Sequence, residues 1–395
     1  MRLTDIRMPD RWLPVCVSLC MMALVLVVAR PAAATTTTLL ESLGYSGSNA
    51  GLVSAGFEEV VVAANWAAIE PSEGVVSASA ITSLQNTINT ATASGLQVAL
   101  DIGTQYAPSW IFGVGGGTRF VDQYGDVFGG SPGSGNDVAN AVTDSAVRTQ
   151  LGDYINYLGT HLTGVSAVRL GGLADNELRY PSGTSGSKPD AFWFYDASSQ
   201  ALLPPSARGW VPGTGTVAQA TTFLGCYNAA MVNFSDWLET VGQQSFHSTT
   251  HLEMMMPGWG DRPGEIGTAQ SNLLVNTPDE INEGLDWADL RWPATSQVVA
   301  YTTYADAIQG TPSNPDPAAY IHSLLPAGMG SGGEPTGNGQ TTPAGENLMF
   351  QDARAWDWYA VTWYFPGQSQ TAVQVGTAWA DSCVLRNPRV AVRCQ

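Results

Sequence analysis

Short apolar runs alternate along the chain with longer stretches in which apolar residues recur every three or four positions. An apolar run of this kind is typical of a strand buried on both faces, and the longer period is typical of a helix that packs on one side. The pattern predicts seven strands, within residues 58–66, 96–103, 165–177, 250–260, 296–306, 327–334 and 359–365. An eighth strand is expected before residue 58, and its candidate is TTTTLLESLGYSG, residues 35–47.

Helical patterns lie between these strands, at 77–95, 147–162, 229–246, 316–325 and 346–358. Regular alternation of strands and helices predicts an α/β fold with a parallel sheet, and eight units predict a (β/α)₈ barrel. We expect the barrel to span residues 35–365, with residues 366–395 as an extension packed on it. An open doubly wound sheet is the alternative, but no GxGxxG motif or phosphate-binding loop follows any strand.

Three long loops rich in Gly, Ser and Pro follow predicted strands, at residues 113–137, 182–216 and 335–345. Long ordered loops are usually functional, and in a barrel they would lie on the rim formed by the carboxyl ends of the strands. The second loop contains Phe192, Trp193, Phe194, Tyr195 and Trp210, too many aromatic residues for a solvated linker.

The N-terminus has the layout of a secretory signal. Three arginines lie within MRLTDIRMPDRW, an apolar run follows, and ARPAAA ends the segment in small residues. We therefore expect residues 1–34 to be a signal peptide cleaved after Ala34, which would place the protein outside the cytoplasm, whether extracellular, periplasmic or at the cell surface. An uncleaved membrane anchor is the alternative.

Removal of residues 1–34 leaves 12 basic and 32 acidic residues, a net charge of −20. This charge opposes binding to nucleic acid or to anionic lipid and favours a neutral partner. The chain also has 13 Trp and 13 Tyr, whose rings can stack on sugars but are equally common in protein cores.

Cysteine and histidine provide no metal-binding pattern. After signal cleavage, Cys383 and Cys394 could form a disulfide that closes a C-terminal loop, leaving Cys226 free in a helix. The four histidines are scattered, and neither HExxH nor CxxC occurs. We therefore expect no catalytic metal and no cofactor.

Two carboxyl groups lie where facing strands are expected to end. Asn176 and Glu177 follow the fourth strand, and Glu334 ends the seventh. Strands four and seven lie across a barrel from one another, so both glutamates would face a central cleft. Hydrolysis of a glycosidic bond requires such a pair: one carboxyl is protonated and donates to the leaving oxygen, and the other is ionised.

These residues resemble clan A glycoside hydrolases. NWAAIEPSEG and GLQVALDIGTQYAPSW are similar to their second and third strand regions, especially in family-42 β-galactosidases. The resemblance implies that Glu177, after Asn176, is the acid/base and that Glu334 is the nucleophile. Many relatives have Asn after the nucleophile, whereas this chain has Pro335.

The resemblance also implies roles for the neighbours of the two glutamates. Asn176 would bind the sugar 2-hydroxyl, Tyr301 or Tyr304 would hold Glu334, and Trp363 would form the floor under the sugar. Two further tryptophans near strand ends, Trp66 and Trp259, are candidate sugar-binding residues. Arg179 is either a neighbour of Glu177 or a buried structural cation, and the sequence leaves both open.

A second resemblance is local. NELRYPSG, with GWVPGTG and CYN downstream, is similar to β-amylases, and PAGENLM then offers Glu346 as the base of an inverting enzyme that uses Glu177 as the acid. Glu346 begins a predicted helix, where a carboxylate stabilises the helix dipole, and its position favours Glu334 as the second carboxylate.

The sequence as a whole predicts a secreted glycoside hydrolase that cleaves a neutral oligosaccharide or polysaccharide with retention, with a specificity like that of a β-galactosidase. The alternatives are the inverting β-amylase-like enzyme and an inactive carbohydrate-binding barrel, for which Pro335 is the hint. A serine hydrolase is disfavoured because no GxSxG follows a strand. The sequence leaves the sugar, exo or endo action and the oligomeric state open.

Overall fold

The computed structural model describes most of the chain after the predicted signal. Three predicted features lie outside the described residues: the signal peptide at 1–34, the side chain of Trp259, and the Cys383–Cys394 pair. The described residues are 38–129, 137–181, 188–258, 261, 263–293, 295–308, 316–336 and 341–382.

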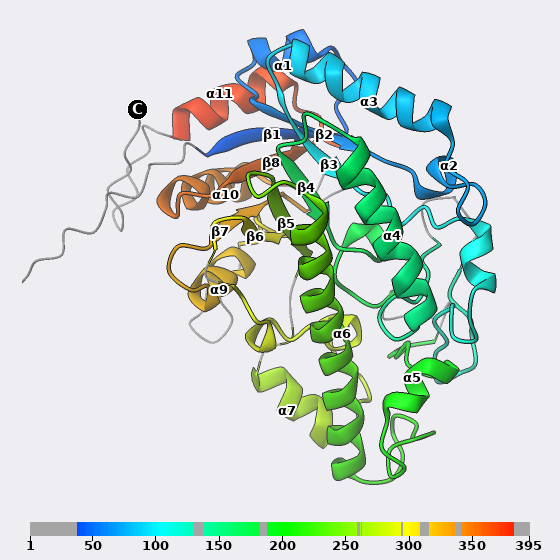
Figure 1. The fold of residues 1–395 in the computed structure, drawn as a ribbon. Helices are drawn as coiled ribbons and strands as arrows, with labels where there is room; N and C mark the ends of the chain where they lie inside the picture. Colours follow the sequence, from blue (N-terminus) through cyan, green and yellow to red (C-terminus); the bar gives the residue numbers. More distant parts are fainter. Residues whose placement is uncertain are drawn as a thin grey trace, which may run out of the picture. The chain divides into compact units, whose positions relative to one another are not determined.

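Eight parallel strands form a closed barrel in chain order (Figure 1). The last strand pairs with the first over five residues, from Leu39–Ala360 to Leu43–Tyr364, and this pairing closes the ring. The strands are β1 (Leu39–Leu43), β2 (Glu59–Ala63), β3 (Gln97–Asp101), β4 (Ala167–Leu170), β5 (His251–Met256), β6 (Val298–Thr302), β7 (Gly330–Gly333) and β8 (Ala360–Tyr364). The predicted fold class is confirmed, and β1 lies within the segment 35–47 that was the candidate for the eighth strand.

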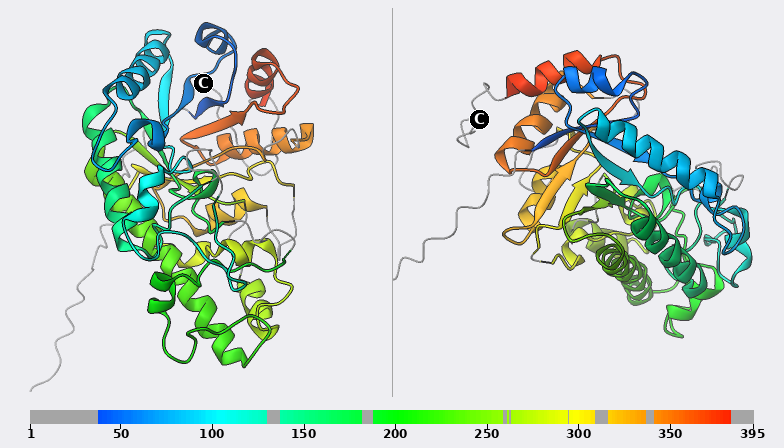
Figure 2. Two further views of the ribbon diagram at one scale, coloured as in Figure 1. Left: turned by 90° about the vertical axis from the view of Figure 1, so that its right-hand side faces the viewer. Right: turned by 45° about the horizontal axis from the view of Figure 1, so that its top comes forward.

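Helices lie around the ring of strands, as the two views in Figure 2 show. The α-helices are α1 (Asn49–Ser54), α2 (Trp66–Ile69), α3 (Ala78–Ala93), α4 (Ser145–His161), α5 (Ala197–Leu202), α6 (Val217–Ser245), α7 (Pro263–Ser271), α8 (Asp279–Glu283), α9 (Pro317–Leu324), α10 (Pro343–Ala355) and α11 (Ala372–Ser382). Short 3₁₀ helices are η1 (Ser109–Gly113), η2 (Ala174–Asn176) and η3 (Trp287–Asp289). Among the described helices, none has the length and apolar composition needed to cross a membrane.

Helix α6 is 29 residues long and begins well before the predicted helix at 229–246. Thr216 and Gln219 form a capping box at its start: each side chain bonds the other residue's backbone N–H, so the first turn is stabilised. Cys226 lies on this helix as a free, half-buried thiol. The extra turns at the N-terminal end of α6 carry Phe223, which packs against the aromatic residues of the second loop.

Helix α11 lies in the segment expected to be an extension and follows β8, as a helix follows each earlier strand in the ring. It contacts α1 and α10 (Figure 1). Its buried side chains include Val375 and Trp379, and the Trp379 ring packs at 5.4 Å from the ring of Phe350 on α10. This helix therefore packs between the helix that follows β1 and the helix that follows β7.

Alternate residues of each strand point into the barrel or outward to the helices, because the side chains of a strand have a period of two. On β8, Thr362 points inward, where its hydroxyl contacts the Tyr301 hydroxyl, while Trp363 packs against Phe350 of α10. The inward positions of this barrel are unusually polar. Glu41 of β1 and Glu253 of β5 are fully buried there.

Candidate active site

A cleft of about 760 Å³ lies where the carboxyl ends of the strands meet. Its wall contains the last residue of each of four strands, Leu43, Ala63, Asp101 and Tyr364. This is the end of a (β/α)₈ barrel where active sites lie, and the volume is in the range of small-ligand sites. The charged groups that line it are Asp101, Asp175, Glu177, Asp279, Glu280, Glu283 and Glu334, with Arg169 and Arg179.

The chain turns sharply after β4 and brings Glu177 to the cleft. Two residues of η2, Asp175 and Asn176, have positive φ angles of 54° and 57°, a backbone conformation that is strained for residues other than glycine. The turn also requires Gly171, because a Cβ there would lie 1.7 Å from the carbonyl oxygen of Asn176. A local sequence with two glycines therefore permits a turn that exposes Glu177 instead of continuing the strand.

Asn176 stabilises this turn. Its carboxamide oxygen accepts hydrogen bonds from the backbone N–H groups of Gly171 at 3.3 Å and Gly172 at 3.1 Å, and its nitrogen donates to the Arg169 carbonyl at 3.1 Å. The Thr104 hydroxyl also donates to the oxygen, at 3.3 Å. The residue is 2% exposed at the base of the cleft that it lines, and these contacts hold the loop in place; its contact with a substrate hydroxyl stays a prediction.

Glu177 is held in a form suited to proton donation. Burial raises the pKa of Glu177 to about 7, although the Arg179 guanidinium and a hydrogen bond with Thr303 both favour the ionised form. Asp175 and Glu334 add a smaller upward shift to this pKa, because like charges disfavour ionisation. The Glu177 carboxyl therefore keeps its proton to a higher pH than an exposed glutamate does.

Arg179 is a neighbour of Glu177, which is one of the two interpretations that the sequence left open. Its Nε lies 2.6 Å from Glu177 Oε2, but the N–H direction is not that of a hydrogen bond, so this contact is an ion pair. The guanidinium also pairs with Asp175 and, at 3.4 Å, with Glu283 of α8. Arg179 thus joins the β4 loop to α8 across the cleft rim.

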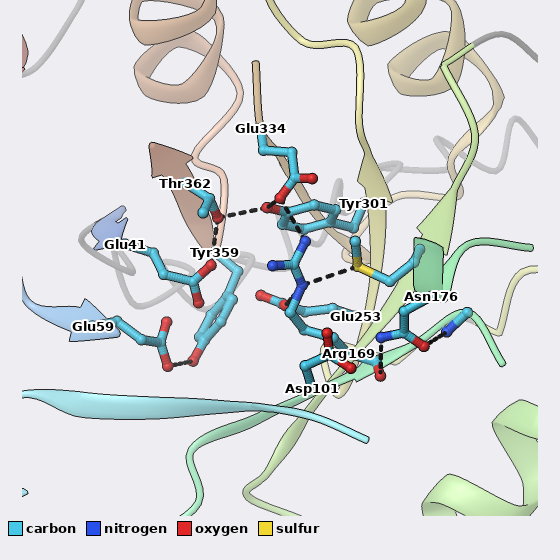
Figure 3. Close-up of polar contacts among 12 residues, drawn as sticks. Glu41, Glu59, Asp101, Arg169, Asn176, Glu253, Tyr301, Glu334, Tyr359 and Thr362 are labelled. Carbon is cyan, nitrogen blue, oxygen red and sulfur yellow. Dashed lines mark hydrogen bonds and ion pairs between the residues drawn. The ribbon is translucent and has the colours of Figure 1, made fainter. Parts of the chain in front are cut away.

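Glu334 directly follows β7 and is anchored by its backbone and its side chain. Its N–H donates to the Thr302 carbonyl at 2.9 Å, which continues the β6–β7 pairing. Its Oε2 accepts hydrogen bonds from the Tyr301 hydroxyl at 2.9 Å and from Arg169 Nη2 at 2.5 Å (Figure 3). Arg169 projects inward from β4 and its side chain is 4% exposed, so the ion pair is shielded from water.

The glycines of β7 make room for this arrangement. A Cβ on Gly332 would lie 3.1 Å from the Tyr301 ring, and one on Gly333 would lie 2.9 Å from the Thr302 carbonyl oxygen. Side chains at these positions would push β6 and Tyr301 away. The strand GSGG, which is weak by propensity, therefore allows Tyr301 to reach Glu334.

Glu177 and Glu334 line the same cleft, as the sequence predicted for the ends of strands four and seven. Their side chains are similarly accessible, 15% and 14% exposed. Pro335 and Tyr304 also line the cleft. Of the two candidate tyrosines, Tyr301 is the one that bonds Glu334.

Two predicted tryptophans lie away from the cleft lining, which corrects the prediction for both. Trp66 is 2% exposed; its ring stacks on Tyr154 at 5.1 Å and its indole N–H donates to Glu70 at 3.0 Å. Trp363 is fully buried because its position on β8 points outward to α10. Tyr364, the next residue, reaches the cleft instead.

Glu346 also lies away from the described cleft lining. It is in the first turn of α10 and is 7% exposed, and its Oε2 accepts a hydrogen bond from Gln370 at 2.9 Å. Burial raises the pKa of Glu346. Its position in the first turn of α10 matches the helix-terminus interpretation.

Sequence reasoning missed Arg169 and Glu283 as parts of the site. Arg169 had a visible signal, since a lone arginine within the apolar run VSAVRLGG must find a buried partner. Glu283 had none, because its helix lies in a connection without strong periodicity. Within the described ranges, no group of three or more His, Cys, Asp or Glu residues is arranged to hold a metal ion.

Comparisons by sequence found no matching family model and no matching curated protein. Solved structures do match. The catalytic domain of β-amylase from Paenibacillus polymyxa has a TM-score of 0.60 at 14% identity, over 87% of this chain and 97% of that one. The β-galactosidase of the psychrophilic Marinomonas ef1 has a TM-score of 0.53 at 13% identity, over 87% of this chain and 59% of that one.

The cold-adapted β-galactosidase of Rahnella sp. R3 matches with a TM-score of 0.51 at 12% identity, over 88% of this chain. This chain spans 56% of that galactosidase, so both galactosidases are considerably longer. At such low identity these likenesses show the barrel fold alone, and the fold that clan A implies is thereby confirmed.

Proposed function

We propose that this protein is a glycoside hydrolase that acts by double displacement with retention of the anomeric configuration. The observation that carries the proposal is the pair Glu177 and Glu334, which come from facing strands to one cleft in two different electrostatic settings. Burial keeps a proton on Glu177 near neutral pH, whereas Glu334 is paired with a buried guanidinium. A retaining glycosidase requires one carboxyl that holds a proton, as the acid/base, and one that is ionised, as the nucleophile.

In the first step, Glu334 attacks the anomeric carbon while Glu177 gives its proton to the departing glycosidic oxygen. The C–O bond to the leaving group breaks and a glycosyl ester forms on Glu334. In the second step, Glu177, now ionised, takes a proton from water as the water attacks the anomeric carbon. The ester bond breaks, and both glutamates return to their initial forms.

The substrate is proposed to be a neutral glycan. Seven carboxyls against two guanidiniums line the cleft, so a uronic acid or sulfated sugar would meet like charge. Tyr106, Tyr304 and Tyr364 supply aromatic side chains for contact with sugar rings. We favour a specificity like that of the β-galactosidases. The second and third strand regions resemble those of family-42 β-galactosidases, and the barrel is similar to two solved β-galactosidase structures.

Inverting hydrolysis is the second candidate, favoured by NELRYPSG and by the β-amylase domain that this chain matches over almost its whole length. It needs a base that activates water, and Glu346, the base that this resemblance implies, lies outside the described lining of the cleft. A binding barrel without activity is the third. Secretion after cleavage at Ala34 is part of the proposal and is tested by N-terminal sequencing of the exported protein.

The test is hydrolysis of a panel of aryl glycosides, with the anomer first released followed by proton NMR. Retention with loss of activity in both Glu177→Gln and Glu334→Gln supports the proposal. Glu346→Gln is the matched control, since it makes the same change in a glutamate outside the cleft lining and should keep its activity. Inversion, or loss of activity in Glu346→Gln together with full activity in Glu334→Gln, would support the β-amylase-like mechanism instead.

A further inference from the structure

The barrel interior beneath the cleft contains carboxyl groups that the proposed mechanism does not use. Glu41 on β1, Glu59 on β2 and Glu253 on β5 are each 0% exposed. Barrel interiors are normally filled by branched apolar side chains, and a buried carboxyl is costly unless it is protonated or paired. Arg169 is the buried cation among them, and its shortest ion pair is with Glu334 rather than with Glu253, which lies 3.9 Å away.

One of these carboxyls is connected to Glu334 by hydroxyl groups. Glu41 Oε1 lies 2.5 Å from Thr362 Oγ1, which lies 2.5 Å from the Tyr301 hydroxyl, which lies 2.9 Å from Glu334 Oε2 (Figure 3). The four residues come from β1, β8, β6 and the end of β7. The contacts form one continuous row from the barrel interior to the proposed nucleophile.

The number of protons in this row limits how it can be arranged. Each hydroxyl has a single hydrogen, so Tyr301 donates either to Glu334 or to Thr362, but not fully to both. If Glu41 is protonated, it donates to Thr362, Thr362 donates to Tyr301, and Tyr301 donates to Glu334. If Glu41 is ionised, Thr362 must donate to Glu41, and Tyr301 then supplies the hydrogen that Thr362 Oγ1 accepts.

We propose that Glu41 is a positioning residue whose proton sets the direction of this hydroxyl row and thereby decides whether Tyr301 donates to Glu334. The inference rests on the proposed function for its effect on catalysis, but the geometry of the row does not. Loss of the Glu41 proton withdraws the Tyr301 hydrogen bond and leaves Glu334 with the Arg169 ion pair. The proposed nucleophile is then less firmly oriented.

The groups around Glu41 allow this switch in an accessible pH range. Burial raises the pKa of Glu41 to about 7, opposed by Arg169 and by the Thr362 hydrogen bond and assisted by Glu334. Glu59 on the neighbouring strand has a pKa raised to about 8, by burial and by Glu41. Burial and Glu41 also raise the pKa of Glu253.

Asp101, Tyr359 and Tyr364 are further titratable groups near the row, and burial and Glu334 raise the pKa of Tyr364. Burial raises the pKa of Asp101 at the end of β3. Burial also raises the pKa of Tyr359, whose hydroxyl donates to Glu59 at 3.1 Å. Arg169 is the cation of the set, and its pKa is raised by Glu334 and other anions in spite of its burial.

Two substitutions fix the row in one direction. In Glu41→Gln the side chain at position 41 no longer titrates, so the direction of the row no longer changes with pH. In Thr362→Val the chain is cut, and Tyr301 has only Glu334 as its acceptor, while Glu41 still titrates. Glu253→Gln is the matched control, because it converts an equally buried carboxyl to an amide outside the row.

The first measurement is kcat/KM of each variant relative to the wild type from about pH 6 to about pH 9. Titration of Glu177 is common to all and cancels in the ratio. We expect the ratio to rise about tenfold with pH in Glu41→Gln and in Thr362→Val, the effect of one hydrogen bond to a charged group, and to stay flat in Glu253→Gln. A flat ratio in both row variants, or a matching rise in Glu253→Gln, overturns the proposal.

The second measurement requires no turnover. The carboxyl carbon of Glu334, ¹³C-labelled and assigned by loss of its NMR signal in Glu334→Gln, is titrated in a Glu177→Gln background. We expect a shift near neutral pH that disappears on adding Glu41→Gln and also on adding Thr362→Val. A shift that survives Thr362→Val means that Glu41 acts through space, which overturns the relay. If the wild type cleaves no glycoside, the proposed function fails while this titration still decides the relay.

Discussion

The ends of β4 and β7 both present a glutamate to one cleft, yet they do so by different physical means. At β4, a strained turn of two residues with positive φ brings Glu177 to the cleft, and burial raises its pKa against the effect of Arg179. At β7, a strand of small residues allows Tyr301 and Arg169 to approach Glu334 and bind its carboxylate. The comparison teaches that a protonated and an ionised carboxyl can share a cleft. Desolvation favours the protonated form of one, and an ion pair with a buried guanidinium favours the ionised form of the other.

The largest effect is expected at β7. Glu334→Gln removes the proposed nucleophile, so kcat should fall on the order of 10⁴-fold or more for every leaving group. Hydrolysis of dinitrophenyl and alkyl glycosides measures it. Activity within tenfold of the wild type on either substrate would assign the nucleophile elsewhere.

At β4 the effect should depend on the leaving group. Glu177→Gln removes the proton donor, which lowers kcat/KM by about 10²- to 10⁴-fold for an alkyl glycoside. A dinitrophenolate departs without protonation, so that substrate should lose much less in kcat/KM. Equal losses on the two substrates would contradict the proton-donor role of Glu177. Glu177 and Glu334 would then no longer differ in how their loss depends on the leaving group.

Tyr301→Phe tests the pairing that anchors Glu334. The substitution keeps the ring against Gly332 but removes the hydrogen bond to the carboxylate, so kcat should fall about 10- to 100-fold. Tyr304→Phe is the matched control, since Tyr304 lines the cleft from the adjacent loop. The comparison of kcat, rather than KM, decides the outcome; a larger loss in Tyr304→Phe would reverse the assignment.

Arg179→Met tests how the Arg179 guanidinium affects the pKa of Glu177. The guanidinium favours the ionised form and so lowers the pKa of Glu177; without it, this pKa should rise from about 7, by ~1 unit or more. The alkaline limb of the kcat/KM profile should therefore move to higher pH. A limb that moves to lower pH, or does not move, would show that Arg179 does not oppose the proton on Glu177.

The smallest expected effect is on stability. Glu41 and Glu59 have pKa values raised to about 7 and about 8 in the folded protein, whereas an unfolded glutamate titrates near about 4.3. The stability that their bound protons provide is fully present below about pH 4 and is lost as the pH rises through 7 and 8. Thermal unfolding should show Tm falling by ~5 °C or more between about pH 5 and about pH 8, less so in Glu41→Gln. A wild-type Tm that rises over this range would contradict the raised values.

Much of this arrangement could be predicted from residues. Short apolar runs that alternate with helical patterns located the strands, and the order of Asn176–Glu177 and Glu334 placed two carboxyls on facing strands. The prediction failed for Trp363 by one residue, because the strand ends could not be fixed well enough to say which neighbour points outward. Trp66 failed for a related reason: an indole near a strand end fits a helix–helix contact as well as a sugar.

The sequence by itself determined the barrel and its candidate glutamates, because both depend on periodicity and on order along the chain. Only the tertiary structure decided how deeply those glutamates are buried and which side chains they pair with. Arg169 reaches Glu334 across 165 residues, Thr362 joins Glu41 to Tyr301 from opposite ends of the chain, and Glu346 is directed toward Gln370. Burial and pairing depend on distances between side chains from different strands, and no local pattern in one sequence encodes those distances.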